Sequence, residues 1–115
     1  MQSKADQFDT QLAVLAEQAK ALTHPARLEI LQILAEQTTC ICADVVDELP
    51  LAQASVSRHL KTLKNAGLVE STVDGPRTFY CLDVEAVRDL ETAMTEYFGH
   101  LTSGLAALTS DSDAC

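Results

Sequence analysis

The sequence predicts a mainly α-helical domain that carries one small β-hairpin, and three observations lead to this fold class. The chain has 115 residues, a length that suits a single domain. Apolar residues recur at steps of three and four along most of it, as they do on amphipathic helices. In the second half of the chain, the pair Asp74-Gly75 separates two β-rich runs, which is the pattern of a hairpin turn.

The first two helices are expected at 6–22 and from Pro25 to about residue 37. The first has an apolar stripe, whose members are Phe8, Leu12, Leu15, Ala19 and Leu22. Pro25 suits the first turn of the second helix, because the N–H that proline lacks would have no partner in the helix there. Thr23 or His24 is expected near the N-cap of that helix.

A helix–turn–helix is expected next. Residues 40–49 should form a short extended piece that enters a short helix, with Asp44 as an early cap, and Pro50 ends that helix. A longer helix follows at about 54–66 and ends at Gly67, a residue suited to a C-terminal cap. The buried face of this longer helix is expected to hold Val56, Leu60 and Leu63.

The rest of the chain is expected to form a wing and a last helix. The two β-rich runs give a hairpin at about 68–82, and apolar residues from Val87 to Leu108 predict a long helix at 84–108. Residues 109–115 are small and polar, so we expect a flexible tail. A helix–turn–helix followed by a hairpin is a known DNA-reading arrangement, so residues 1–108 predict a single winged helix-turn-helix domain.

Charge is distributed unevenly along the chain. The net charge is −9, which taken as an average argues against binding to nucleic acid. Residues 1–50 carry −5 and residues 83–115 carry −6, whereas residues 51–82 carry +2. The positive segment coincides with the predicted helix–turn–helix and wing. We therefore expect this segment to contact DNA, although a solvated polar helix face would have a similar composition.

The predicted recognition helix at about 54–66 has a polar face opposite its apolar one. The residues at its start fit contacts to base edges, and the two lysines fit contacts to phosphate, which position a protein without specifying sequence. Arg77, just past the hairpin tip, is expected to touch the minor groove or the backbone. The candidate DNA-binding residues are Gln53, Ser55, Ser57, Arg58, His59, Lys61, Lys64 and Arg77.

The first and last helices, at 6–22 and 84–108, have apolar stripes with no obvious partner within the chain. One winged unit makes few base contacts, so we expect these two helices to pack across a two-fold axis in a homodimer. The alternative is that both helices cover the core of their own chain.

Cys40 and Cys42 form the sharpest chemical feature. Two thiolates separated by one residue lie on the same face only of an extended chain, so they can chelate one ion only there. Ordinary winged-helix topology pairs a strand at this point with the second wing strand, which brings Cys81 near. Three soft thiolates favour a thiophilic ion. Cys115 is a less favoured ligand, although zinc would take a fourth cysteine or a histidine.

Other roles for the cysteines are open at this point. A free cysteine also packs well as a small apolar side chain, above all Cys81 in its strand. A redox disulfide from Cys81 to either Cys40 or Cys42 is conceivable, whereas one between Cys40 and Cys42 would be strained.

Residues 20–82 resemble the arsenic-repressor family of metal-sensing winged-helix regulators, ArsR/SmtB. The runs that carry the resemblance are Leu22–Leu31, Thr39–Asp44 and Gln53–Val69, together with Gly75, Arg77 and Tyr80. The resemblance implies a homodimer that represses its own operon and leaves DNA when an inducer binds. It also implies that Cys40 and Cys42 are ligands for trivalent arsenic or antimony, As(III) or Sb(III).

The chain departs from the best-known pattern of that family at one ligand. A third cysteine usually follows three residues after the pair, but Val45 stands there, and Cys81 is our substitute. Cadmium- and lead-sensing relatives have further cysteines near the N-terminus, and this one has none. The zinc-sensing relatives begin the last helix with Asp-x-His, whereas this chain has Asp89-Leu-Glu91 and a single later histidine, His100.

The sequence thus predicts a repressor of operator DNA that requires no cofactor for DNA binding and that As(III) or Sb(III) induces. The alternatives are a redox- or persulfide-sensing repressor, a Cd, Pb or Zn sensor of the same fold, and, more remotely, a metal-carrying thiol protein without a DNA role. The lack of a nucleotide loop or of a Cys–His pair argues against an enzyme. The first residues lack a secretory signal and no run reaches the roughly 18 apolar residues of a membrane span, so we expect a cytoplasmic protein.

Overall fold

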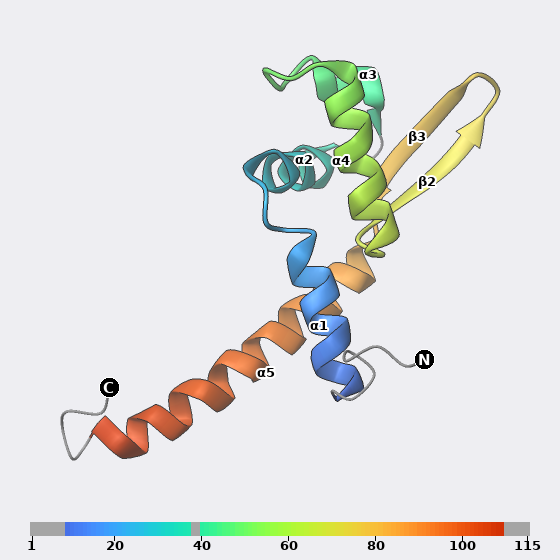
Figure 1. Ribbon diagram of the computed structural model, residues 1–115. Coiled ribbons are helices and arrows are strands. Elements are labelled where there is room, and N and C mark those ends of the chain that lie inside the picture. Colours follow the sequence, from blue (N-terminus) through green and yellow to red (C-terminus); the bar gives the residue numbers. More distant parts are fainter. Residues whose placement is uncertain (1–8, 38–39, 110–115) are drawn as a thin grey trace, which may run out of the picture.

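The computed structural model describes residues 9–37 and 40–109 (Figure 1). Its elements follow the predicted order, a mostly helical chain with a two-strand hairpin, which confirms the fold class. The elements are α1 (Thr10–Lys20), α2 (Pro25–Glu36), β1 (Cys40–Ile41), α3 (Cys42–Val46), α4 (Gln53–Asn65), β2 (Val69–Asp74), β3 (Arg77–Leu82) and α5 (Val84–Thr109). The predicted tail at 110–115 lies outside the described residues.

Local capping explains where the first helices begin. The Asp9 carboxylate accepts a hydrogen bond of 2.7 Å from the backbone N–H of Gln11 at the start of α1. His24 is the N-cap of α2, and its Nδ1 accepts from the N–H of Ala26 at 3.0 Å, with Pro25 in the first turn. The N-cap is therefore His24, one of the two residues that the sequence favours there.

The first helix is shorter at its C-terminal end than the apolar stripe predicts. It ends at Lys20 rather than at residue 22, because the chain turns there to enter α2. The Thr23 hydroxyl donates to the Lys20 carbonyl at 2.8 Å, and so satisfies one of the acceptors that a helix end leaves free.

Three strands form one antiparallel sheet in the order β1-β3-β2. The hairpin β2–β3 turns at Gly75, whose φ of 63° is the left-handed backbone that glycine adopts readily. The short strand β1 pairs with β3, and the register sets Cys40 opposite Tyr80 and Ile41 opposite Phe79. The expected pairing of the segment at Cys40 with the second wing strand is thus present.

The core lies between the helices of the helix–turn–helix and the base of the wing. Val56, Leu60 and Leu63 of α4 are fully buried, as the spacing predicts. They pack with other apolar side chains, of which the most deeply buried are Ile30, Val45 and Leu68. Val45, which stands where a third cysteine is expected from the resemblance, is fully buried in this cluster.

One residue joins α4, the wing and α5. The backbone N–H of Leu68 donates to the Leu63 carbonyl at 3.1 Å, and the Leu68 carbonyl accepts from the N–H of Asp83 at 3.0 Å. Gly67 before it has a φ of 82°, so the chain turns sharply at the end of α4. We call this junction of Leu63, Leu68 and Asp83 the Leu68 node.

The last helix runs away from the winged body (Figure 1). It begins at the Leu68 node, where the Asp83 carboxylate accepts from the N–H of Ala86 at 3.0 Å, and α1 lies beside its first half. Tyr97, Phe98 and Leu101 farther along it are exposed. No helix within residues 9–37 and 40–109 is long and apolar enough to cross a membrane.

Candidate nucleic-acid interface and cysteine site

The exposed face of α4 carries most of the predicted DNA-binding residues. Its apolar side is buried in the core, so the other side faces solvent. Gln53, Ser57, Arg58, Lys61 and Lys64 are exposed, and Ser55 is half-buried. Arg77, at the start of β3, is exposed beside the hairpin turn. The helix and the tip of the wing thus hold these polar side chains outside the core.

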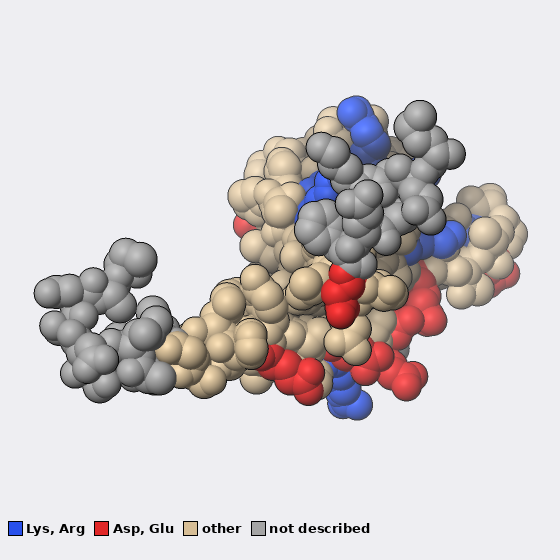
Figure 2. Space-filling view, turned by 60° about the horizontal axis from the view of Figure 1, so that its bottom comes forward, with Lys and Arg blue, Asp and Glu red and all other residues tan. Residues whose placement is uncertain are grey.

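Charge on the surface follows the division seen along the chain. In the view of Figure 2, acidic side chains gather over the lower part of the molecule and the basic ones lie mostly over its upper part. The acidic residues of α5 are Glu85, Asp89, Glu91 and Glu96, with Arg88 among them. A surface that repels phosphate thus adjoins one that attracts it.

His59 has different surroundings from the rest of this face. Its side chain is half-buried, and its Nδ1 lies 3.1 Å from Nη1 of Arg27. The ring of His24 is 4.5 Å away, centroid to centroid, at a tilt of 44°. Burial first, and then the charges of His24, Arg27 and Arg58, lower the pKa of the His59 imidazole. His59 is therefore held against α2, and its surroundings favour the neutral imidazole.

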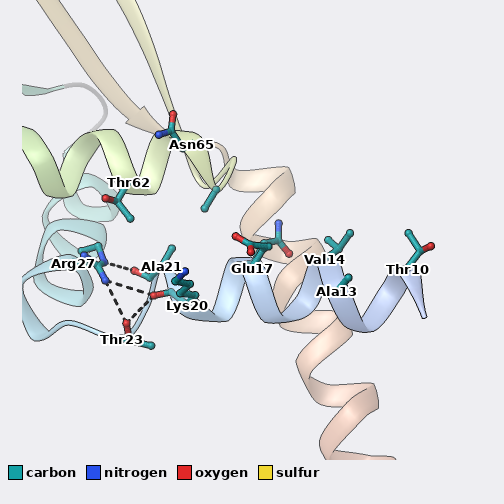
Figure 3. Close-up of a pocket in the computed structure, with 12 residues that line it drawn as sticks. Thr10, Ala13, Val14, Glu17, Lys20, Ala21, Thr23, Arg27, Thr62 and Asn65 are labelled. Carbon is teal, nitrogen blue, oxygen red and sulfur yellow. Dashed lines mark hydrogen bonds between the residues drawn. The ribbon is translucent and has the colours of Figure 1, made fainter. Parts of the chain in front are cut away.

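Arg27 is a functional candidate that the sequence analysis missed. Its guanidinium donates through Nε to the Ala21 carbonyl at 2.7 Å, and through Nη2 to the Lys20 carbonyl at 3.5 Å and to the Thr23 hydroxyl at 3.3 Å (Figure 3). It therefore connects the end of α1 to α4 through His59. Nothing in the spacing of the sequence indicates a contact between residues 32 positions apart.

The two neighbouring cysteines lie where β1 passes into α3. Cys40 is in β1, Cys42 is the first residue of α3, and Ile41 between them has φ −89° and ψ 163°. The backbone at Ile41 is thus extended, as a chelate of Cys40 and Cys42 requires. The N–H of Ile41 donates to the Asp44 carboxylate at 3.0 Å, which fixes this junction.

The Cys42 thiol is half-buried among core side chains. Burial raises the pKa of Cys42 above its ordinary value. Burial also raises the pKa of Tyr80, with a smaller contribution from Cys42, and both side chains pack against the core. Cys42 and Cys81 are both free thiols.

Cys81 lies one residue beyond Tyr80 in β3 and pairs with Glu70 of β2. Successive residues of a strand point to opposite faces, so Cys81 and Tyr80 lie on opposite faces of β3. Among the side chains that the structure describes, no group of three or more His, Cys, Asp or Glu residues is arranged to hold a metal ion. The side chain of Cys40 and the whole of Cys115 lie outside this description.

Two cavities border α1. One, of about 690 Å³, lies between α1 and α5, and Leu12, Leu15 and Tyr97 are among the residues that line it. The other, of about 860 Å³, separates α1 from the C-terminal half of α4. Figure 3 shows α1 along one side of this second cavity, Thr62 and Asn65 of α4 across it, and Arg27 at one end.

Comparison with known proteins agrees with this geometry. Residues 24–71 match the model of the bacterial regulatory proteins of the arsR family. An uncharacterised HTH-type transcriptional regulator of Methanocaldococcus jannaschii is 40% identical over 76 residues, which cover 65% of this chain and 84% of the relative.

Two further relatives have names that specify a response. A homologue of the cadmium resistance transcriptional regulatory protein CadC from Staphylococcus aureus is 35% identical over 77 residues, 66% of this chain and 63% of that protein. The arsenical resistance operon repressor of Bacillus subtilis is 36% identical over 72 residues, 62% of this chain and 68% of that protein.

Solved structures share the fold. An ArsR-like transcriptional regulator from Rhodococcus aligns with a TM-score of 0.73 at 24% identity, over 90% of this chain and 97% of that one. A homodimeric winged helix-turn-helix DNA-binding domain from Mycobacterium bovis, described as a possible ArsR-family regulator, aligns with a TM-score of 0.65 at 27% identity. That alignment covers 87% of this chain and 91% of the other.

Proposed function

Because the chain belongs to the ArsR family of bacterial regulatory proteins, which are DNA-binding transcriptional regulators and not enzymes, we propose that it is a metalloid-responsive repressor. It acts in the cytoplasm as a homodimer, binds operator DNA in the absence of inducer, and releases that DNA when Cys40 and Cys42 bind trivalent arsenic or antimony. The DNA interface, the dimer and the inducer site each have their own support.

The DNA interface consists of the exposed face of α4 and the tip of the wing. α4 enters the major groove, where Gln53, Ser55 and Ser57 with Arg58 meet base edges. Lys61 and Lys64 contact phosphate, and Arg77 contacts the minor groove or the backbone. The exposure of Lys61, Lys64 and Arg77 supports these roles, as does the positive charge of this segment.

The dimer forms through α1 and α5. The groove between these helices is lined by Leu12, which is 48% exposed, and Tyr97, which is 40% exposed. Apolar residues exposed together along two helices are typical of a covered surface. The homodimeric domain of M. bovis aligns over most of this chain, which supports a second copy as the occupant.

The observation that carries the inducer proposal is the position of the cysteine pair. Cys40 belongs to β1, which is hydrogen-bonded to β3 of the wing, and Cys42 begins α3, the first helix of the helix–turn–helix. An ion held by both thiolates fixes the backbone between them and thereby moves the wing relative to α4. Soft sulfur ligands select a thiophilic ion over Mg²⁺ or Ca²⁺.

Cys81 is the proposed third ligand, ahead of Cys115. It follows Tyr80, the residue paired with Cys40, so the distance along the sheet is short. Because Cys81 points to the other face of β3 from Tyr80, its ligation requires β3 to twist. Such a twist would link inducer binding to the wing. To shift DNA occupancy from 99:1 to 1:99, the inducer must prefer the DNA-free form by about 5.5 kcal/mol.

A DNA-binding titration tests the proposal. We would measure the binding of the reduced protein to the DNA upstream of its own gene by gel shift, and titrate the complex with arsenite. The variant C42S should bind the DNA as the wild type does but stay bound in arsenite. Release of C42S at the wild-type arsenite concentration would contradict the ligand assignment.

Further titrations distinguish an arsenite sensor from repressors that respond to other inducers. Cadmium and zinc on the same complex would identify a divalent-metal sensor, and diamide or polysulfide would identify a redox or persulfide sensor. The variant C81S should respond to arsenite more weakly than the wild type. A full response by C81S would indicate instead that Cys115 is the third ligand or that the site has only two thiolates.

A further inference from the structure

Arg27, His24 and His59 form a cluster between the helix of the proposed dimer interface and the recognition helix. The cavity of about 860 Å³ keeps α1 away from the C-terminal half of α4. Arg27 lies at one end of this cavity and donates to the carbonyls at the end of α1 (Figure 3). It also reaches His59 of α4. The contact between Arg27 and His59 is thus a polar link between the end of α1 and α4, beside the apolar packing of the core.

The bond between Arg27 and His59 fixes the state of the histidine. An arginine side chain only donates hydrogen bonds, so His59 Nδ1 must accept and must carry no proton. His24 is constrained in the same way, because its Nδ1 accepts from the backbone N–H of Ala26. In this arrangement Nδ1 of each ring serves as an acceptor. A second proton on either ring removes an acceptor that the structure uses.

The charges around His59 all oppose its protonation. The groups that act on it are His24 from the turn after α1, Arg27 from α2, and Arg58 from its own helix. Within the part of the chain that the structure describes, α3 and β2 also pack on α4, but no carboxylate from them acts on His59. A protonated His59 would face a permanent cation at 3.1 Å and a second imidazole at ring-contact distance.

We propose that Arg27 is a positioning residue for the recognition helix, and that protonation of His59 breaks its bond to Arg27 and weakens DNA binding. Arg27 and His59 act on the DNA through the placement of α4 and not by contact. This inference rests on the proposed function, because it assumes that α4 binds the operator. It adds a response to acid that does not use the cysteines.

The sign of the effect separates this role from direct contact. Acid makes the protein less negative, which by itself tightens binding to DNA. A histidine that touched phosphate would also bind more tightly once protonated. Loss of the Arg27 bond, in contrast, predicts weaker binding in acid. The lowered pKa of His59 places that loss below the ordinary histidine midpoint of about 6.5.

The test compares affinities for upstream DNA at about pH 8 and about pH 5.5, a range in which histidine is the side chain that titrates. The readout is the ratio of the two dissociation constants within each variant. The wild type should bind about tenfold more weakly at the lower pH, as expected for the loss of one charge-assisted hydrogen bond. Circular dichroism at both pH values confirms that the protein stays folded.

The three histidines of the chain provide matched variants. In H59Q the amide oxygen still accepts from Arg27 but does not titrate, so its ratio should be about one or below. H24N keeps the N-cap acceptor and removes the ring that lies against His59, so its ratio should lie between those of H59Q and the wild type. His100 lies in the groove between α1 and α5, away from Arg27 and His59, and H100Q should keep the wild-type ratio.

Several results would overturn the inference. The first is a ratio of dissociation constants near or below one in the wild type. The second is a ratio in H59Q equal to that of the wild type. The third is a ratio near one in H100Q together with an unchanged ratio in H59Q. If neither the wild type nor any variant binds the DNA at about pH 8, the proposed function fails. A measurement without DNA then still tests whether His59 is bound to Arg27. In an NMR titration of the free protein, His59 should titrate below about 6.5; a midpoint at or above that value rules out the neutral, Arg27-bound state.

Discussion

The surroundings of single side chains determine what each cysteine and histidine can do. Cys42 is half-buried against the core, and burial raises the pKa of its thiol, which favours the protonated form. A buried protonated thiol is a poor nucleophile but still a good ligand, because an incoming ion displaces the proton. The microenvironment of Cys42 therefore favours ion binding over rapid oxidation.

Alkylation kinetics measure this property of Cys42. Its raised pKa means a smaller thiolate fraction near neutral pH, so iodoacetamide should modify it more slowly than free cysteine at about pH 7.5. The rate should rise as the pH increases beyond the ordinary thiol midpoint of about 8.5. Mass spectrometry of the peptide that contains residue 42 gives the rate, and arsenite should protect it. A rate above that of free cysteine would point to a redox thiol instead.

At the scale of elements, the two faces of α4 have different roles: the buried face stabilises the fold, and the exposed face is the proposed DNA-binding surface. Leu60 is fully buried, and its neighbour Lys61 is exposed. One residue thus contributes to the core and the next to the DNA surface, because neighbouring positions on a helix do not share a face. Substitutions on the two faces should therefore change different measurements.

The pair L60A and K61A tests this division. L60A leaves a cavity in the core and should lower the free energy of unfolding by about 2–5 kcal/mol, as measured by urea denaturation. K61A should change that free energy by no more than about 0.5 kcal/mol, yet weaken DNA binding and reduce its dependence on salt. Equal loss of stability in both variants would contradict this description of the helix.

The turn at the end of α4 provides a further prediction. Gly67 has a φ of 82°, and a Cβ placed there would meet no atom within 4 Å, so the cost of a substitution comes from the backbone alone. G67A should lower the unfolding free energy by about 1–2 kcal/mol. G99A provides the control, because Gly99 lies within α5 in similarly open space, and alanine there should stabilise the helix.

At the scale of the whole molecule, the two ends of the chain build one surface. α1 and the first half of α5 lie side by side, with exposed apolar residues between them and acidic residues around them. Most of the acidic residues then lie on the helices of the proposed dimer interface, and not on the proposed DNA interface of α4 and the wing. Negative charge there lowers the non-specific affinity for DNA.

A charge placed in the groove between α1 and α5 tests the dimer. L12D should dissociate the protein into folded monomers in sedimentation experiments at micromolar concentration, because Leu12 is 48% exposed and outside the core. V73D is the matched control: Val73 is 73% exposed on the wing, so this variant should remain a dimer. Dissociation of V73D, or an unchanged dimer in L12D, would place the interface elsewhere.

The elements were predictable because each has a local signal, whereas the side-chain network was not. Apolar spacing gave α4 and α5, and the pair Asp74-Gly75 gave the hairpin. The pairing of β1 with β3 followed from ordinary winged topology, but its register did not, so the sequence did not show that Cys40 pairs with Tyr80 and not with Cys81. The bond of Arg27 to His59 depends on how two helices approach each other, and sequence spacing does not encode that approach.

The Leu68 node has a consequence for the spacing of the two half-sites in the operator. Because Leu68 ties the end of α4 to the start of α5, these two helices should turn together as a rigid lever when α5 packs on a second copy. The distance between the two recognition helices is then set by the angle of the dimer, near the 34–36 Å of one DNA turn. One base pair inserted at the centre of the operator shifts the half-sites by about 3.4 Å and rotates them, which the lever could not follow. The protein would thus measure the spacing of its site as well as read its bases.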